Sequence, residues 1–189
     1  MYFEMKVQAG KKNGVIKWPN LSEGVRAFQW GEKIDVKVPE PIQFLVDFTR
    51  ENPPTDFASD FMPILSDRLI GAFQNAGVQN MQTFKAILVN PFTGESWDNY
   101  KVVNVTKKIS CADLASSDYI ELFKPSLIFM NLLISETKAQ GALLFRLEES
   151  LDKILVHKDV LSYMYTKNNE PVFEGVEFDA VKSTLEIND

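Results

Sequence analysis

One pattern of ten residues occurs twice in this chain and constrains its fold more than any other feature. It spans residues 64–73 and 155–164, and in both copies two adjacent apolar residues lead into three polar ones. An apolar pair, and one more apolar residue three positions further on, then mark a single face of a helix. Each copy therefore predicts a strand, a capping residue and a helix, with Ser66 and His157 at equivalent cap positions.

The predicted ends of the two helices also match. The first helix is expected to end at Gly77, and the second, at about residues 158–167, ends beside Asn168. Gly and Asn are the residues that most readily adopt the left-handed conformation that closes a helix. Two explanations stay open: an internal duplication that gives two similar strand-helix-strand lobes, or the ordinary appearance of strand-to-helix connections.

The remaining segments contain several further short strands. Residues 83–90 and 99–107 flank the Pro- and Gly-containing segment 91–96, which predicts a hairpin. Residues 127–133 fit a buried strand or a helix equally well. Other strands are expected at residues 36–38, 44–48, 143–147, 154–156 and 172–178. Strands and helices do not alternate regularly, so the predicted fold is α+β, with mixed, mainly antiparallel sheets and a few short helices.

The length and composition suggest one soluble domain. The 189 residues suit a single domain over 1–189, with sub-lobes at 1–110 and 111–189 as the alternative division. The N-terminus lacks a basic stretch followed by an apolar run, and no apolar stretch reaches the length of a membrane span, so we expect a cytoplasmic protein. The net charge of −6 disfavours a nucleic-acid partner and favours a basic protein partner.

The sequence offers few residues for catalysis or metal binding. The only histidine is His157 and the only cysteine is Cys111, so neither a nucleophile-histidine pair nor a zinc ligand set is expected. We interpret His157 as a helix cap and Cys111 as a buried, inert thiol. Asp56 and Asp60 lack the spacing of a calcium loop, so we expect both in a solvated loop, and no glycine-rich phosphate motif occurs. We therefore predict no catalytic, cofactor-binding or metal-binding residues.

Two kinds of residue keep other functions open. Carboxylate pairs such as Glu148 with Glu149, or Glu174 with Glu177, would be required by a carboxylate-based hydrolase. Any chain with 26 acidic residues contains such pairs, so a solvated surface is the simpler interpretation.

Large aromatic residues in predicted loops are the other candidates. Trp18, Trp30 and Trp97 either fold back onto the core or act as anchors in a binding surface. The predicted hairpin tip is the best candidate for a partner-binding surface, because two aromatic residues lie there next to two acidic ones. Its residues are Phe92, Glu95, Trp97 and Asp98.

Several blocks, in this order and spacing, resemble one protein family. They are DF at 56–57, PILSDRL at 63–69, YKVVNV at 100–105, CAD at 111–113, LFRL at 144–147 and ILV at 154–156. The chain resembles the immunity proteins of bacterial polymorphic toxin systems, in the family first known from a myxobacterial protein and long described as a domain of unknown function. It departs from the family at residues 157–159, where a small polar cap residue is more usual.

The resemblance implies a function but no site residues. It implies a non-enzymatic, cytoplasmic protein that binds and neutralises a cognate toxin domain. A protein- or peptide-binding module with another partner is the alternative, and a carboxylate-based hydrolase is a third.

Overall fold

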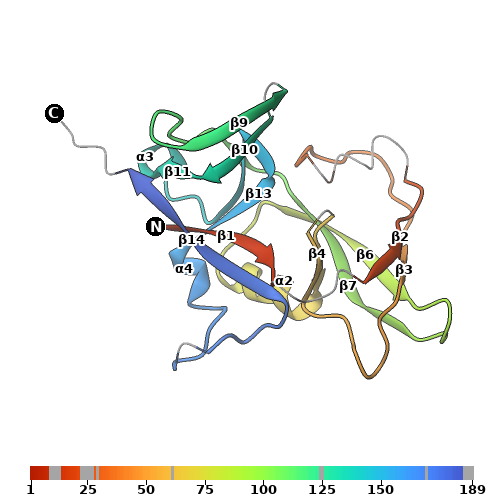
Figure 1. Ribbon diagram of the computed structural model, residues 1–189. Helices are drawn as coiled ribbons and strands as arrows, with labels where there is room; N and C mark the ends of the chain where they lie inside the picture. The colour runs from red at the N-terminus through yellow and green to blue at the C-terminus, as the bar shows by residue number, and fades with distance from the viewer. Residues whose placement is uncertain are drawn as a thin grey trace.

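The computed structural model describes residues 1–8, 14–21, 28, 30–60, 62–123, 126–168 and 170–184 (Figure 1). In this part of the chain the strands form two six-stranded sheets and one two-stranded sheet. No helix in the described ranges is long and apolar enough to cross a membrane.

The first sheet is formed mainly by the N-terminal half of the chain. Its strands, in spatial order, are β2 (Val15–Lys17), β3 (Ile42–Val46), β6 (Met81–Val89), β7 (Ser96–Val105), β5 (Ile64–Ser66) and β4 (Phe57–Ser59). β6 and β7 form the predicted hairpin, with Phe84 opposite Val102. β3 and β6 are parallel, and the other pairings in this sheet are antiparallel.

The second sheet combines the C-terminal half with the first strand of the chain. Its order is β11 (Leu133–Ser135), β14 (Val176–Thr184), β1 (Tyr2–Val7), β13 (Ser150–His157), β12 (Leu144–Leu147) and β8 (Lys108–Ile109). Two pairings, β11 with β14 and β8 with β12, are parallel. The remaining pair, β9 (Asp118–Phe123) and β10 (Ser126–Asn131), is antiparallel and projects at the top of Figure 1. The fold is therefore α+β with mixed, mainly antiparallel sheets, as predicted.

The helix α2 (Asp67–Asn75) follows β5 directly and agrees with the first copy of the pattern. The side chain of Ser66 accepts a hydrogen bond from the Leu69 amide (3.2 Å), which is the expected N-cap contact. After the helix Gly77 has a φ of +89°, and the Val78 amide donates to the Phe73 carbonyl (3.0 Å). The predicted start and end of this helix are both confirmed.

The second copy is confirmed at its start and wrong at its end. His157 caps α4 (Lys158–Leu161), and its side chain accepts from the Asp159 amide (3.4 Å). The helix stops after one turn instead of continuing to residue 167. Thr166 explains the difference, because its backbone N–H donates to the Glu170 carbonyl (2.8 Å) and its hydroxyl accepts from two later amides. The chain thus turns back where the pattern predicted helix.

Two predicted strands are also wrong. Residues 36–38 form no strand, and the chain bends at Val36; just before this bend the side chain of Gln82 bonds both backbone groups of Ile34. The closing strand was expected at residues 172–178 but runs over Val176–Thr184. It begins only after Gly175, which has a φ of +76° and packs directly against Thr55.

A third strand-cap-helix unit occurs in the segment that was ambiguous in sequence. β11 leads through Ser135, whose hydroxyl accepts from the Lys138 amide (3.4 Å), into α3 (Glu136–Ala139). All three described helices therefore start from the last residue of a strand. This favours the interpretation that such connections are ordinary local structure and not a sign of duplication. Residues 127–133, in turn, are extended, in β10 and the start of β11.

The central core joins the two large sheets. It contains Met5 from β1, Leu69 and Phe73 from α2, Val103 from β7 and Val156 from β13. Two further apolar clusters lie against other parts of the sheets, one around Phe44 and one around Cys111. Because α2 and α4 both contribute to the central core, their apolar faces are buried together.

Candidate functional site

The predicted hairpin tip is a well-ordered turn that presents one aromatic side chain to solvent. The buried side chain of Asn90 donates to the Phe48 carbonyl (2.7 Å) and accepts from the amides of Phe92 (2.8 Å) and Thr93 (3.2 Å). Gly94, with a φ of +76°, completes the turn. Phe92 is 82% exposed as a result, the largest exposed fraction among the large apolar residues of the described ranges.

The two acidic residues of the tip differ in their surroundings. Glu95 accepts hydrogen bonds from the Thr93 hydroxyl (2.9 Å) and the Arg50 amide (3.3 Å), and lies 3.5 Å from the Arg50 guanidinium. It therefore connects the tip to the neighbouring loop. Asp98 is exposed on β7.

Trp97 points back toward the first sheet. Its ring meets Phe48 edge to face, with 6.4 Å between centroids, and packs against the core around Phe44. Trp18 likewise meets Phe44 edge to face, whereas Trp30 is exposed. Phe92 and Asp98 are thus the members of the predicted set that a partner can reach most directly, while Glu95 and Trp97 hold the tip in place.

Asp56 is the centre of a buried polar cluster that the sequence did not predict. Its carboxylate accepts from the Ser66 hydroxyl (2.5 Å), from Arg68 at both oxygens (2.8 and 2.6 Å) and from the Glu174 amide (2.9 Å). Burial by itself would raise the pKa of Asp56, but these hydrogen bonds hold it below its usual range. The expectation that Asp56 lies in a solvated loop is wrong, because it is only 7% exposed.

The geometry of this cluster is that of a structural connection. The Ser66 hydroxyl both donates to Asp56 and caps α2, while Arg68 also donates to the Val172 carbonyl (3.1 Å). The cluster therefore joins the loop before β4, the start of α2 and the segment before β14. Both oxygens of Asp56 are already satisfied by protein donors, which is unlike the arrangement of a metal ligand.

Arg146 is a second buried charged residue that sequence reasoning missed. It is almost fully buried on β12, and donates to the carbonyls of Leu151 (2.6 Å) and Phe28 (3.0 Å). Burial lowers the pKa of Arg146 to about 10. Its burial was not predicted because Arg146 lies in the largely apolar run LFRL. Such a run predicts a buried strand, in which a charged side chain is not expected.

Cys111 and His157, the residues considered for nucleophilic catalysis, have structural roles. Cys111 is buried, and that burial raises the pKa of its thiol to about 12, so the thiol is inert as predicted. His157 caps α4, and its ring lies edge-on to Tyr2 with 5.0 Å between centroids.

The carboxylates that could serve a hydrolase lie in different surroundings. Glu149 is half-buried and its side chain lines a hollow, whereas its neighbour Glu148 is exposed. Glu174 lines another hollow beside Asp56, and Glu177 is half-buried on β14.

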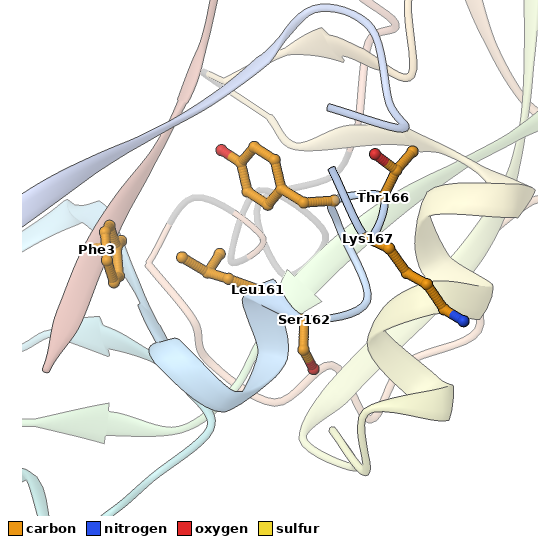
Figure 2. Close-up of a pocket in the computed structure, with 6 residues that line it drawn as sticks. Phe3, Leu161, Ser162, Thr166 and Lys167 are labelled. Atoms are coloured by element: carbon orange, nitrogen blue, oxygen red, sulfur yellow. The ribbon is translucent and has the colours of Figure 1, made fainter. Parts of the chain in front are cut away.

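A hollow with a volume of about 620 Å³ lies between β1 and α4 (Figure 2). Leu161 points toward Phe3, whereas Ser162 and Lys167 extend away from both in Figure 2. The polar side chains therefore do not converge on one point, as they do in a typical small-molecule site.

A comparison with protein families gives a match over most of the chain. The model of a family described as "Immunity protein family (Imm11)" matches residues 5–183. A search of curated proteins finds no match. The family match confirms the resemblance that the sequence blocks indicated, and it extends over nearly the whole chain.

Proposed function

Because the chain belongs to the Imm11 immunity protein family, we propose that it binds a cognate toxin domain and neutralises it by contact, without catalysing a reaction itself. The match over residues 5–183 is the observation that carries this proposal. It is further proposed that the protein acts in the cytoplasm, and that residues 1–189 form one immunity-type domain. The central core supports the last point, since it contains residues from β1, β7 and β13 together.

The tip of the β6–β7 hairpin is the proposed toxin contact. An exposed phenylalanine on a rigid turn loses little conformational entropy when it enters an apolar pocket of a partner. Phe92 has this geometry, and Asp98 adds an exposed negative charge nearby on β7. A stable complex would bury about 1,200–2,000 Å² in total, so the tip would be only one part of the interface.

The overall charge supports a basic partner surface. With a net charge of −6, the protein attracts a positively charged toxin domain over long range, which increases the association rate. Raising the salt concentration should therefore slow association more than it changes dissociation.

A titration of toxin activity tests the mode of action. The toxin domain encoded beside this gene would be assayed with increasing amounts of the purified protein. A stoichiometric inhibitor abolishes activity near a 1:1 ratio and co-elutes with the toxin in size-exclusion chromatography. Full protection at a small fraction of that ratio would indicate catalysis, and an absence of any complex or protection would contradict the proposal altogether.

A pair of variants tests the contribution of the tip. Phe92→Ser should weaken toxin binding by about tenfold or more, because an anchor residue contributes about 1.4 kcal/mol or more. Tyr163→Ser is the matched control, since Tyr163 is also an exposed aromatic residue but lies just after α4. Equal affinity of the two variants for the toxin would exclude the tip from the interface.

A further inference from the structure

The β9–β10 hairpin exposes apolar side chains on the face that is turned away from the core. Leu127 is buried and Phe129 packs against the core around Cys111. On the other face Ile120 lies opposite Ile128, and the exposed fractions are 53% and 48%, with 66% for Met130. A strand with one solvated face normally carries polar residues there. The apolar residues on both faces of β10 instead fit a strand that is covered on both sides.

A hollow with an unsatisfied carboxylate oxygen lies beside this hairpin. The Leu127 amide donates to the Glu149 carbonyl (2.8 Å), so β10 lies beside the backbone of a residue whose side chain lines the hollow. Glu149 Oε1 accepts from the Ser110 hydroxyl (2.8 Å) and the Ala112 amide (3.2 Å). Glu149 Oε2 is buried and has no hydrogen-bond partner among the described residues. The hollow has a volume of about 550 Å³, enough for a long side chain.

The charges around the hairpin and the hollow are mainly negative. Asp113 lines the hollow with Glu149, and Asp118 and Glu121 are exposed on β9. None of these four carboxylates forms an ion pair with another described residue. Lys138 is the basic residue that lines the hollow, and Lys124 lies outside the described residues. The surface therefore complements a partner that is basic and has apolar side chains.

We propose that this surface docks a basic segment of the toxin. Ile120, Ile128 and Met130 are covered by apolar side chains of that segment. One arginine or lysine side chain enters the hollow and pairs with the carboxylate of Glu149, which lines it. This inference rests on the proposed function, and it adds a second contact surface on the opposite half of the chain from the Phe92 tip.

The hollow can be tested without the toxin. Ethylguanidinium and ethylammonium chlorides would be titrated separately into the ¹⁵N-labelled protein, with sodium chloride at equal ionic strength as the control. The Ala112 amide reports on binding, because it donates to the same carboxylate. We expect a saturable shift with one or both cations that is lost in Glu149→Gln. No shift, or the same shift in Glu149→Gln, would overturn the assignment of a cation site.

The docking surface is tested with the toxin domain encoded beside this gene. Ile128→Thr and Met130→Gln keep exposed strand positions occupied by similar-sized side chains, so the fold should persist, as thermal unfolding would show. Each variant, and Glu149→Gln, should weaken toxin binding by about tenfold, as expected for interface residues worth about 1.4 kcal/mol. Tyr163→Ser is again the control.

The outcomes separate this inference from the function it rests on. If the unaltered protein binds the toxin and the three variants bind equally well, the docking surface is wrong and the proposed function stands. If the unaltered protein does not bind the toxin, both fail. If sedimentation shows a dimer that Ile128→Thr converts to a monomer, the face pairs two copies of this chain and the inference is overturned.

Discussion

Replacing Asp56 by asparagine should destabilise the protein more than any other change of a single carboxylate to its amide in the described chain. Asn retains one acceptor oxygen, which can keep the hydrogen bonds from Ser66 and from Nε of Arg68. Its amide group would then face two donors, Nη2 of Arg68 and the Glu174 amide, which lie 2.6 and 2.9 Å from the carboxylate. Two charge-assisted hydrogen bonds are therefore replaced by contacts between donors.

The expected loss in the free energy of unfolding is about 2–3 kcal/mol. A hydrogen bond to a charged group contributes about 1.5–3 kcal/mol when it is shielded from water. The contribution of Arg68 is smaller, because its side chain is 57% exposed and can be hydrated after the change. The bond from the Glu174 amide is part-buried beside Asp56 and keeps most of its value.

Urea unfolding at several pH values provides the measurement. The pKa of Asp56 is lower in the folded protein than in the unfolded chain. Its carboxylate therefore stabilises the fold fully above the unfolded pKa of about 4, and this contribution is lost as the pH falls through the lower, folded pKa. The difference between the unaltered protein and Asp56→Asn should be largest near neutral pH and should shrink in acid.

The control for this experiment is Asp98→Asn, at an exposed carboxylate, which should change stability by less than about 0.5 kcal/mol at any pH. A loss for Asp56→Asn as small as that of the control, or a gap that stays constant into acid, would refute the account of this cluster.

Three further predictions concern the backbone, the thiol and the buried guanidinium. Gly175→Ala should lower the free energy of unfolding by about 3 kcal/mol or more, because the new Cβ would lie 2.0 Å from the Thr55 hydroxyl oxygen. Gly94→Ala, with the same φ of +76° but open space around it, should lower it by only about 1–2 kcal/mol. Thermal unfolding of both variants measures the difference. Cys111 should not react with iodoacetamide at pH 8 in the folded protein and should react in urea, since burial raises its pKa to about 12; rapid labelling without urea would contradict its placement. Arg146→Lys should reduce the free energy of unfolding by about 2 kcal/mol, because a single ammonium group cannot reach both the Leu151 and Phe28 carbonyls, and a variant as stable as the original in urea would show that one contact suffices.

The local signals in the sequence predicted local structure well. Ser66 and His157 cap helices because a strand residue with a side-chain acceptor can satisfy the first free amides, which depends only on neighbouring residues. The hairpin around Gly94 is likewise specified within a few residues. The errors have two causes. A local turn, in which Thr166 bonds to Glu170, ends α4 early, and a contact between distant residues, Thr55 packed on Gly175, delays the last strand.

The candidate site shows the same division. The sequence indicated an exposed turn at Phe92, but the supporting roles of Glu95 and Trp97 depend on Arg50 and Phe48, which belong to another loop. The oxygen of Glu149 that lacks a partner could not be predicted at all.

The sequence by itself determined the family, the α+β class, the caps and the hairpin, because each is specified by short patterns of residue type. Only the tertiary structure decided which carboxylates are buried and what they bind. The carboxylate of Asp56 accepts from the Glu174 amide, and that of Glu149 accepts from the Ser110 hydroxyl, across long stretches of chain. The burial and hydrogen bonding of a charge depend on everything that packs around it, and that environment exists only once the sheets have come together.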